Sequence, residues 1–176
     1  MKHEPRNSKL ALRIGYGFDS HEFRSGIPLK IGGIALPHDK GLGGHSDGDV
    51  LLHAITDALL GAIAAPDIGA LFPPSDPKWK GADSVIFLRE ALKRVKQAGY
   101  HVANIDSSLI LAAPKIGPHA PSIRARVAEL LGVPGTCVGL KAKTPEGLNL
   151  ENAAIAHVTV LLERSANSKR PTSKRK

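Results

Sequence analysis

Residues 15–23, GYGFDSHEF, place an acid and a histidine two positions apart at the end of a strand-like segment. In an extended strand Asp19 and His21 would point to the same side, so a carboxylate oxygen and an imidazole nitrogen would converge on one small volume. Such a pair is a candidate for two ligands of a metal ion. A turn that carries a solvated acid and histidine is the alternative, and a third ligand would favour the metal site.

A third candidate ligand lies in HSDGDVLLH, residues 45–53, which leads into a predicted helix. At roughly 100° per residue, His53 lies about 200° from Leu51 and faces away from the apolar stripe of that helix. Asp19, His21 and His53 would supply one oxygen and two nitrogen ligands, and three protein ligands with a fourth position open are typical of a catalytic zinc site. A chance pairing stays open because the chain has 8 histidines. His45 precedes the helix, whose unpaired backbone N–H groups would attract an anion such as a phosphate.

The elements that must position these residues alternate between strands and helices without a regular repeat. Apolar residues at every second position from Leu10 to Phe18 are typical of a half-buried strand whose apolar face is opposite Asp19 and His21. A helix is predicted from an N-cap at Ser46 to Pro66, followed by a loop over 66–82. Further helices are expected at 84–98 and 121–132, with strands at 101–113, 138–143 and 155–163. This order favours an α/β fold, a two-layer α+β sandwich in which helices pack on one face of a mixed sheet.

Composition and charge narrow the class of protein. The net charge is +8, but residues 1–9 carry +2 and the five Lys and Arg residues of 165–176 carry +5, so the body is nearly neutral. We expect one domain at 10–164 between two disordered basic tails, 1–9 and 165–176, and no nucleic-acid binding by the body. A nucleic-acid-binding accessory role through the tails is one alternative. No apolar run could span a bilayer, no secretory signal is present and Cys137 is the single cysteine, so we expect a cytoplasmic protein that binds no membrane.

Five segments in the same order make the chain resemble a known enzyme family: GFDSHEF, GGHSDGDVLLHAITDALLGA, DIGALFPPSDPKWKGADS, APKIGPH and KAKTPEGL. From about Arg13 to Arg164 the chain is similar to the 2-C-methyl-D-erythritol 2,4-cyclodiphosphate synthases of the non-mevalonate isoprenoid pathway. The resemblance implies a homotrimer with an active site at each subunit interface, a zinc ion and a second divalent cation, Mg²⁺ or Mn²⁺. It also implies a phosphorus–oxygen lyase. The 2-phosphate of 4-diphosphocytidyl-2-C-methyl-D-erythritol 2-phosphate would attack the β-phosphate, closing a cyclic diphosphate and expelling CMP.

The resemblance also implies residue roles, carried over by motif match. Asp19, His21 and His53 would bind zinc, while His45 and Ser46 would bind phosphates, with His45 also stabilising charge in the transition state. The methylerythritol part would contact Asp67, Ile68, Gly69, Phe72 and Asp76. The cytosine would contact Ala113, Pro114, Lys115 and Ile116. Thr144 would contact phosphate as a catalytic residue, and Glu146 would help to hold the second cation between diphosphate oxygens.

The chain departs from the family pattern in two segments. KAKTPEGLNLENAA lacks a GRGE segment that contributes to the cavity along the trimer axis, which predicts weak or absent isoprenoid-diphosphate binding there. Pro74 stands where the family carries an acid that contacts the diol, so Asp76 alone remains of that pair. Spacing alone does not separate cyclisation from hydrolysis. A metal-dependent phosphohydrolase that acts on a nucleotide-linked substrate is therefore the other alternative.

Overall fold

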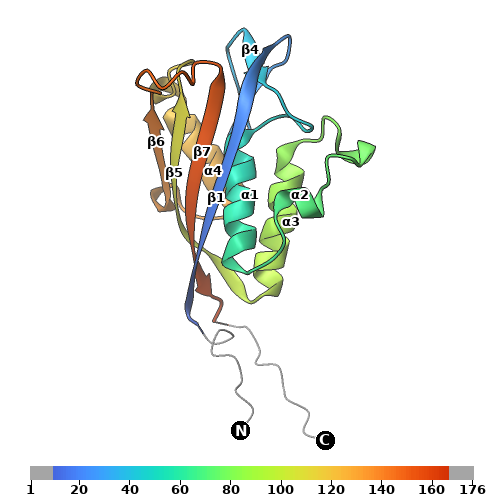
Figure 1. Cartoon of the computed structure of the whole chain (residues 1–176). Coiled ribbons are helices and arrows are strands. Elements are labelled where there is room, and N and C mark those ends of the chain that lie inside the picture. Colours follow the sequence, from blue (N-terminus) through green and yellow to red (C-terminus); the bar gives the residue numbers. More distant parts are fainter. Residues whose placement is uncertain (1–9, 167–176) are drawn as a thin grey trace, which may run out of the picture.

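The computed structural model describes residues 10–166, which form two layers (Figure 1). The strands are β1 (Leu12–Ser25), β2 (Leu29–Ile31), β3 (Ile34–Leu36), β4 (Lys40–Leu42), β5 (Tyr100–Leu111), β6 (Val138–Lys143) and β7 (Ala153–Arg164). The helices are α1 (Val50–Ala62), α2 (Ile68–Leu71), α3 (Ser84–Gln97) and α4 (Ala120–Leu131), with single 3₁₀ turns at Pro77–Trp79, Gly117–His119 and Gly135–Cys137.

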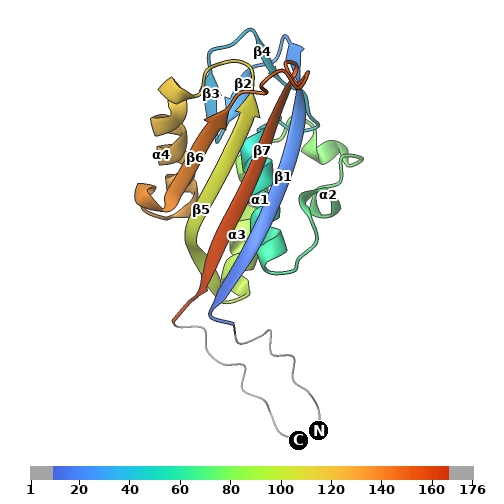
Figure 2. The same ribbon diagram turned by 60° about the vertical axis from the view of Figure 1, so that its left-hand side comes forward.

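The large sheet has the order β4-β1-β7-β5-β6 and mixes both kinds of pairing. β7 is antiparallel to β1 and to β5, whereas β5 and β6 are parallel and are joined by the crossover helix α4. Figure 2 shows the sheet in front and the helices behind it, with α1 and α3 behind β1 and β7. The predicted mixed sheet with helices on one face is confirmed.

The inner face of β1 carries glycines, Gly15 and Gly17, where it packs against α1, contrary to the expectation of a half-buried apolar face. Alternation is present, but the apolar set of Leu12, Ile14, Tyr16 and Phe18 points away from the helices and is 52%, 71%, 59% and 47% exposed. Gly15 and Gly17 face α1 instead, and a Cβ on Gly17 would lie 1.9 Å from the Ala54 carbonyl oxygen. The absence of these side chains lets the helix backbone lie directly on the strand.

Helix α1 begins at Val50, so the prediction of a start at Ser46 is wrong. Gly48 has φ +72°, a left-handed conformation that interrupts the helix, and Asp49 is the N-cap instead. The Asp49 carboxylate accepts hydrogen bonds from the N–H groups of Leu52, Gly32 and Gly33. The carboxylate thus joins the start of the helix to the β2–β3 hairpin. Burial of Asp49 raises the pKa of its carboxyl group. The helix ends at Ala62, before Pro66, because Ala64 also has a positive φ of 55°.

The segment expected to be a loop, residues 66–82, holds helix α2 and a 3₁₀ turn. Asp67 caps α2 by accepting from the Ala70 N–H, and Asp76 caps the 3₁₀ turn by accepting from the Lys78 N–H. Helix α3 begins after its predicted cap, Asp83. None of the helices within residues 10–166 is long and apolar enough to cross a membrane.

The predicted tails lie outside the described residues, apart from Ser165 and Ala166. The Ser165 N–H donates to the Gly99 carbonyl, beside the end of β7. The boundaries at 10 and 164 stay predictions.

Candidate metal centre and the adjoining pocket

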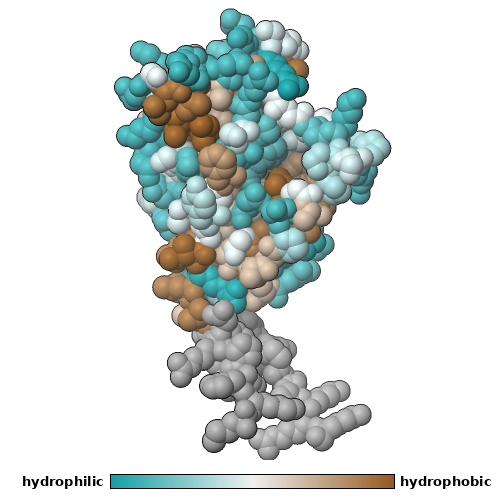
Figure 3. Space-filling view, viewed as in Figure 1, coloured by the Kyte–Doolittle hydropathy of each residue, from teal (hydrophilic) through white to brown (hydrophobic). Residues whose placement is uncertain are grey.

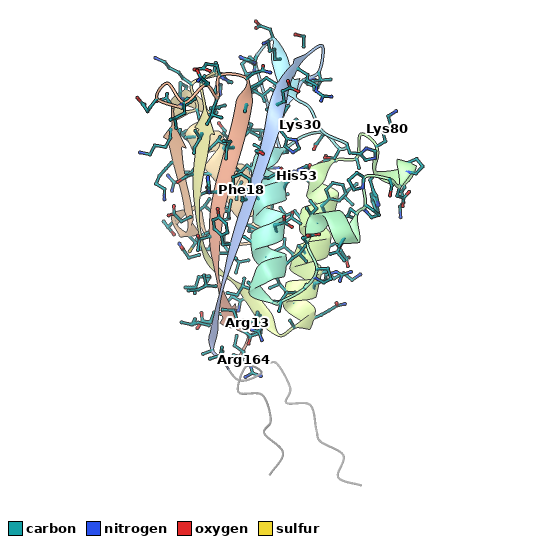
Figure 4. All side chains as sticks on the ribbon, in the orientation of Figure 1. Arg13, Phe18, Lys30, His53, Lys80 and Arg164 are labelled. Carbon is teal, nitrogen blue, oxygen red and sulfur yellow. The ribbon has the colours of Figure 1, made fainter. Side chains whose placement is uncertain are left out.

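Three side chains from β1 and α1 meet at one point between the sheet and the helix layer. Asp19 Oδ2 lies 2.8 Å from His21 Nε2 and 3.0 Å from His53 Nδ1, and these two nitrogens are 3.1 Å apart. Figure 4 shows His53 on α1 where this helix passes behind β1. Because Asp19 and His21 share the inner face of β1 with Gly17, the close approach of α1 brings His53 onto them.

The charges of this cluster are strongly coupled. Burial by itself would raise the pKa of Asp19, but hydrogen bonds from His21 and His53 lower it to about 2. Burial would lower the pKa of His21, yet the Asp19 carboxylate outweighs this effect and raises it. The side chains of Asp19, His21 and His53 are 26%, 15% and 12% exposed, so the cluster is largely shielded and still reachable from solvent.

The chemistry of these donors fits a metal ion. One carboxylate oxygen and two imidazole nitrogens, all within 4.8 Å of one another, can surround a single cation, and such donor sets are common around zinc. Within residues 10–166 no other group of three or more His, Cys, Asp or Glu side chains is gathered in this way. The candidate triad predicted from the sequence is therefore present as a geometric cluster.

A pocket of about 180 Å³ opens beside the cluster. The pocket is lined by residues of β1, of the segment before α1, of α1 itself, of the 66–82 segment and of α3. These residues are His21, His45, Ser46, His53, Ile68, Gly69, Phe72, Pro74, Trp79 and Phe87. Phe72, Trp79 and Phe87 form a packed aromatic wall with ring centroids 4.6 to 5.7 Å apart. The pocket thus combines two candidate metal-ligating histidines with an apolar wall.

Five of the predicted substrate residues lie in this pocket and the others do not line it. His45, Ser46, Ile68, Gly69 and Phe72 are part of the lining. Asp67 and Asp76 lie in the same segment, where each uses one carboxylate oxygen to cap a turn of helix.

The residues predicted to contact cytosine and the second cation lie elsewhere in the chain. Ala113, Pro114, Lys115 and Ile116 follow β5, and the Ile116 side chain is buried in the core at 2% exposure. Thr144 and Glu146 follow the edge strand β6, where the Thr144 hydroxyl donates to the Glu146 carboxylate. Neither group lines the pocket of its own chain.

The structure adds site residues that the sequence did not single out. Trp79 and Phe87 complete the aromatic wall, and Ser84 contacts His53. Asp57, in contrast, was already a candidate from the sequence, as either a partner of the site four residues after His53 or an exposed acid. It accepts a hydrogen bond from the Ile68 N–H (2.8 Å), which ties α2 to α1, and burial raises the pKa of its carboxyl group. The one available signal was Trp79, the single tryptophan, because it lies in a long segment between two helices.

Comparisons with known proteins agree with this arrangement. The YgbB family model matches residues 12–163. A 2-C-methyl-D-erythritol 2,4-cyclodiphosphate synthase of Koribacter versatilis is 69% identical over 153 residues, which cover 87% of this chain and 99% of that protein. A chloroplastic synthase of the same name from Arabidopsis thaliana is 52% identical over 161 residues, 90% of this chain and 70% of that protein. A solved structure of such a synthase in a CDP-bound form is 43% identical with a TM-score of 0.82, and the match covers 86% of this chain and all of that chain.

A mixed α/β fold with a pocket that opens on a cluster of candidate metal ligands is typical of an enzyme. The chain belongs to the YgbB family, and it is an enzyme of the lyase class like the synthases that it resembles. The resemblance indicated by the five sequence segments is confirmed.

Proposed function

We propose that the enzyme converts 4-diphosphocytidyl-2-C-methyl-D-erythritol 2-phosphate into 2-C-methyl-D-erythritol 2,4-cyclodiphosphate and CMP, a step of the non-mevalonate isoprenoid pathway. The main support is the convergence of Asp19, His21 and His53 at the pocket of a chain 69% identical to a synthase of that name. An oxygen of the 2-phosphate attacks the β-phosphorus and forms the new P–O bond. The bond from that phosphorus to the oxygen bridging the two phosphates breaks, and CMP leaves with this oxygen and the electron pair.

Asp19, His21 and His53 are proposed to hold Zn²⁺, which when bound would polarise the attacked phosphoryl group. His21 and His53 also line the pocket, so phosphates that enter it reach the same side chains. His45 and Ser46 lie beside them and are proposed to bind the phosphates and to offset the negative charge that develops on the phosphoryl oxygens. His45 and Ser46 thus form the proposed anion-binding part of the pocket.

The apolar side of the pocket suits the methylerythritol part of the substrate. Ile68, Gly69 and Phe72 line it, and we propose that they cover this group and exclude water. Asp67 and Asp76 each keep a second carboxylate oxygen that no cap uses, and these oxygens are the proposed acceptors for the diol hydroxyls.

The cytidine end of the substrate needs more space than this pocket provides. Sites for ligands of this size usually measure about 300–1,000 Å³, and the pocket measures about 180 Å³. Two solved synthase structures, one of them from Plasmodium falciparum at 30% identity and a TM-score of 0.77, are CDP complexes. They support a cytidine-diphosphate-linked substrate for this chain as well.

The missing walls are proposed to come from a neighbouring subunit of a homotrimer. Figure 1 shows α2, which borders the pocket, and β6, which precedes Thr144 and Glu146, at opposite sides of the molecule. Residues 113–116 of one subunit would then bind the cytosine at the metal centre of the next. Thr144 and Glu146 would similarly bind phosphate and a second cation, Mg²⁺ or Mn²⁺.

The outer face of β1 supports such an assembly. Its four large apolar side chains are about half exposed or more, and Figure 3 shows hydrophobic residues gathered toward the sheet side of the molecule. Contiguous exposed apolar residues mark interaction surfaces. A trimer that buries this face would leave the metal centres on the helix side of each sheet. Cys137 is a free cysteine, which fits the cytoplasmic location that we propose.

Phosphorus NMR of the zinc-loaded enzyme, incubated with the proposed substrate and Mg²⁺, tests this function. Equal amounts of CMP and the cyclic diphosphate are expected. CMP with a non-cyclic phosphate product would instead identify the phosphohydrolase alternative, because water would then have attacked the β-phosphorus. Light scattering of the same sample should report three times the mass of the chain, and a monomer that turns over at full rate would refute the shared site.

A further inference from the structure

The two ring nitrogens of His53 have different surroundings. Nδ1 faces the ligand cluster, 3.0 Å from Asp19 Oδ2 and 3.1 Å from His21 Nε2. Nε2 faces away from the cluster, 2.8 Å from Ser84 Oγ and 3.0 Å from Ser46 Oγ. If Nδ1 donates its lone pair to a metal, the hydrogen of the neutral ring must be on Nε2. The ring then needs an acceptor on that side.

Ser84 is arranged to be that acceptor. It is the first residue of α3, its side chain is fully buried, and its hydroxyl contacts Asp47 Oδ1 as well as His53 Nε2. An ionised carboxylate can only accept, so the Ser84 hydroxyl donates its hydrogen to Asp47. Its lone pairs are left for the N–H of His53. The direction of the chain of hydrogen bonds is therefore fixed from His53 to Ser84 to Asp47.

Asp47 is itself held in place by several donors. The N–H groups of Ser84 and Asp49 lie 3.3 and 3.4 Å from Oδ1, and Lys30 Nζ forms an ion pair with Oδ2 at 3.0 Å. Lys30 is the cation above His53 in Figure 4, beyond the start of α1. This partner holds the Asp47 carboxylate in one orientation, and the Asp47 side chain is only 12% exposed. The chain of hydrogen bonds from His53 through Ser84 to Asp47 therefore ends in the ion pair between Asp47 and Lys30.

We propose that Ser84 and Asp47, with Lys30 behind them, are positioning residues that fix the ring orientation and the Nε2–H tautomer of His53 as a metal ligand. The proposal rests on the metal centre of the proposed function. Partners of this kind orient a ligating histidine and raise its basicity, and their loss typically costs about 10- to 100-fold in metal affinity. Neither residue lines the pocket, so both act through His53.

Ser46 touches the same nitrogen and provides a matched comparison. Its Oγ accepts from the Gly48 N–H at 3.4 Å, and among the described residues no carboxylate takes its hydroxyl hydrogen. It also lines the pocket, whereas Ser84 does not. Ser46 is thus able to donate to an anion in the pocket while Ser84 serves the metal ligand. The two serines should give different phenotypes although both contact His53 Nε2.

The test is the zinc affinity of the full chain, measured by competition with a chromophoric chelator. Ser84→Ala should bind zinc about 10- to 100-fold more weakly than the wild type. Ser46→Ala should stay within about threefold in zinc affinity, because Ser84 still accepts from His53, and should raise KM for the substrate instead. Nitrogen-correlated NMR of the zinc-loaded wild type should show the Nε2–H of His53 protected from exchange, and Ser84→Ala should lose that protection. Equal zinc affinities of Ser84→Ala and the wild type would overturn the proposal.

A double-mutant cycle tests whether Asp47 acts on His53 through Ser84, as a relay, or independently of Ser84. If Asp47 acts through Ser84, Asp47→Asn should weaken zinc binding in the wild type and change it little in Ser84→Ala. Additive losses of zinc affinity would overturn the relay. Denaturant unfolding of each metal-free variant controls for loss of the fold. A wild-type chain that binds no zinc would overturn the metal centre together with the relay. Normal zinc binding without turnover would overturn the proposed reaction alone.

Discussion

Substitution of Gly17 by alanine should separate β1 from α1 and disrupt the proposed metal centre. A Cβ at this position would lie 1.9 Å from the Ala54 carbonyl oxygen and 2.7 Å from the Ala58 nitrogen, both of them backbone atoms of a buried helix. Ordinary contact begins near 3.4 Å, so strand and helix must move apart by about 1.5 Å. Metal ligands must be placed to within about 0.2 Å. Overpacking of a core costs typically about 1–3 kcal/mol, and a clash with backbone belongs at or above the upper end of that range.

Denaturant unfolding of the metal-free protein and zinc titration measure the two effects separately. Gly17→Ala should lower the free energy of unfolding by about 3 kcal/mol or more and should abolish stoichiometric zinc binding. Gly61→Ala, on α1 itself, is the matched control, because its Cβ would meet only the Tyr16 carbonyl oxygen at 3.7 Å. It should stabilise the protein by up to about 1 kcal/mol through helix propensity and leave zinc affinity unchanged. A Gly17→Ala protein with wild-type stability and zinc affinity would refute the view that glycine sets the strand–helix distance.

Three further outcomes follow from the site. His53→Ala should remove zinc binding and nearly all turnover while leaving the circular dichroism spectrum intact, and a zinc-free, active variant would contradict the ligand assignment. Asp57→Ala should release the Ile68 N–H, cost about 1–2 kcal/mol and raise KM with zinc affinity unchanged, whereas Asp57→Asn, which keeps an acceptor, should restore KM. The lowered pKa of Asp19 should contribute about 2 kcal/mol of stability to the metal-free protein, fully present above pH 3.8 and lost as the pH falls through about 2. The difference in unfolding free energy between wild type and Asp19→Asn from pH 2 to 5 measures it, and a difference that does not change with pH would contradict it.

The candidate ligands could be predicted from the sequence because each depends on a local period. Asp19 and His21 lie two apart on a strand, and the angle of His53 on its helix follows from 3.6 residues per turn. The cap of α3 at Asp83 was equally local, since its side chain accepts from the Val85 N–H two residues on. Local rules of this kind need no knowledge of the tertiary structure.

The errors came where contacts between distant residues decide the outcome. Asp49 rather than Ser46 caps α1 because the N–H groups of Gly32 and Gly33, 17 and 16 residues away in sequence, donate to its carboxylate. Ser84 was recognisable only as the start of a helix, and its contact with His53 joins residues 31 positions apart. Alternation along β1 identified two faces but not which of them meets α1. That choice depends on how closely a helix can approach, and glycines rather than large apolar residues permit the approach here.

The arrangement of β1 links the proposed assembly to the proposed chemistry. Successive residues of a strand point to opposite faces, so Phe18 faces outward next to Asp19, which faces the metal centre. A partner that packs on Phe18 and Tyr16 would therefore restrain the backbone that carries Asp19 and His21. The same partner would bring its residues 113–116 toward the pocket from outside the chain. Formation of the proposed trimer would therefore also align the proposed ligands, because a single strand supplies both surfaces and its inner glycines place its backbone directly against α1.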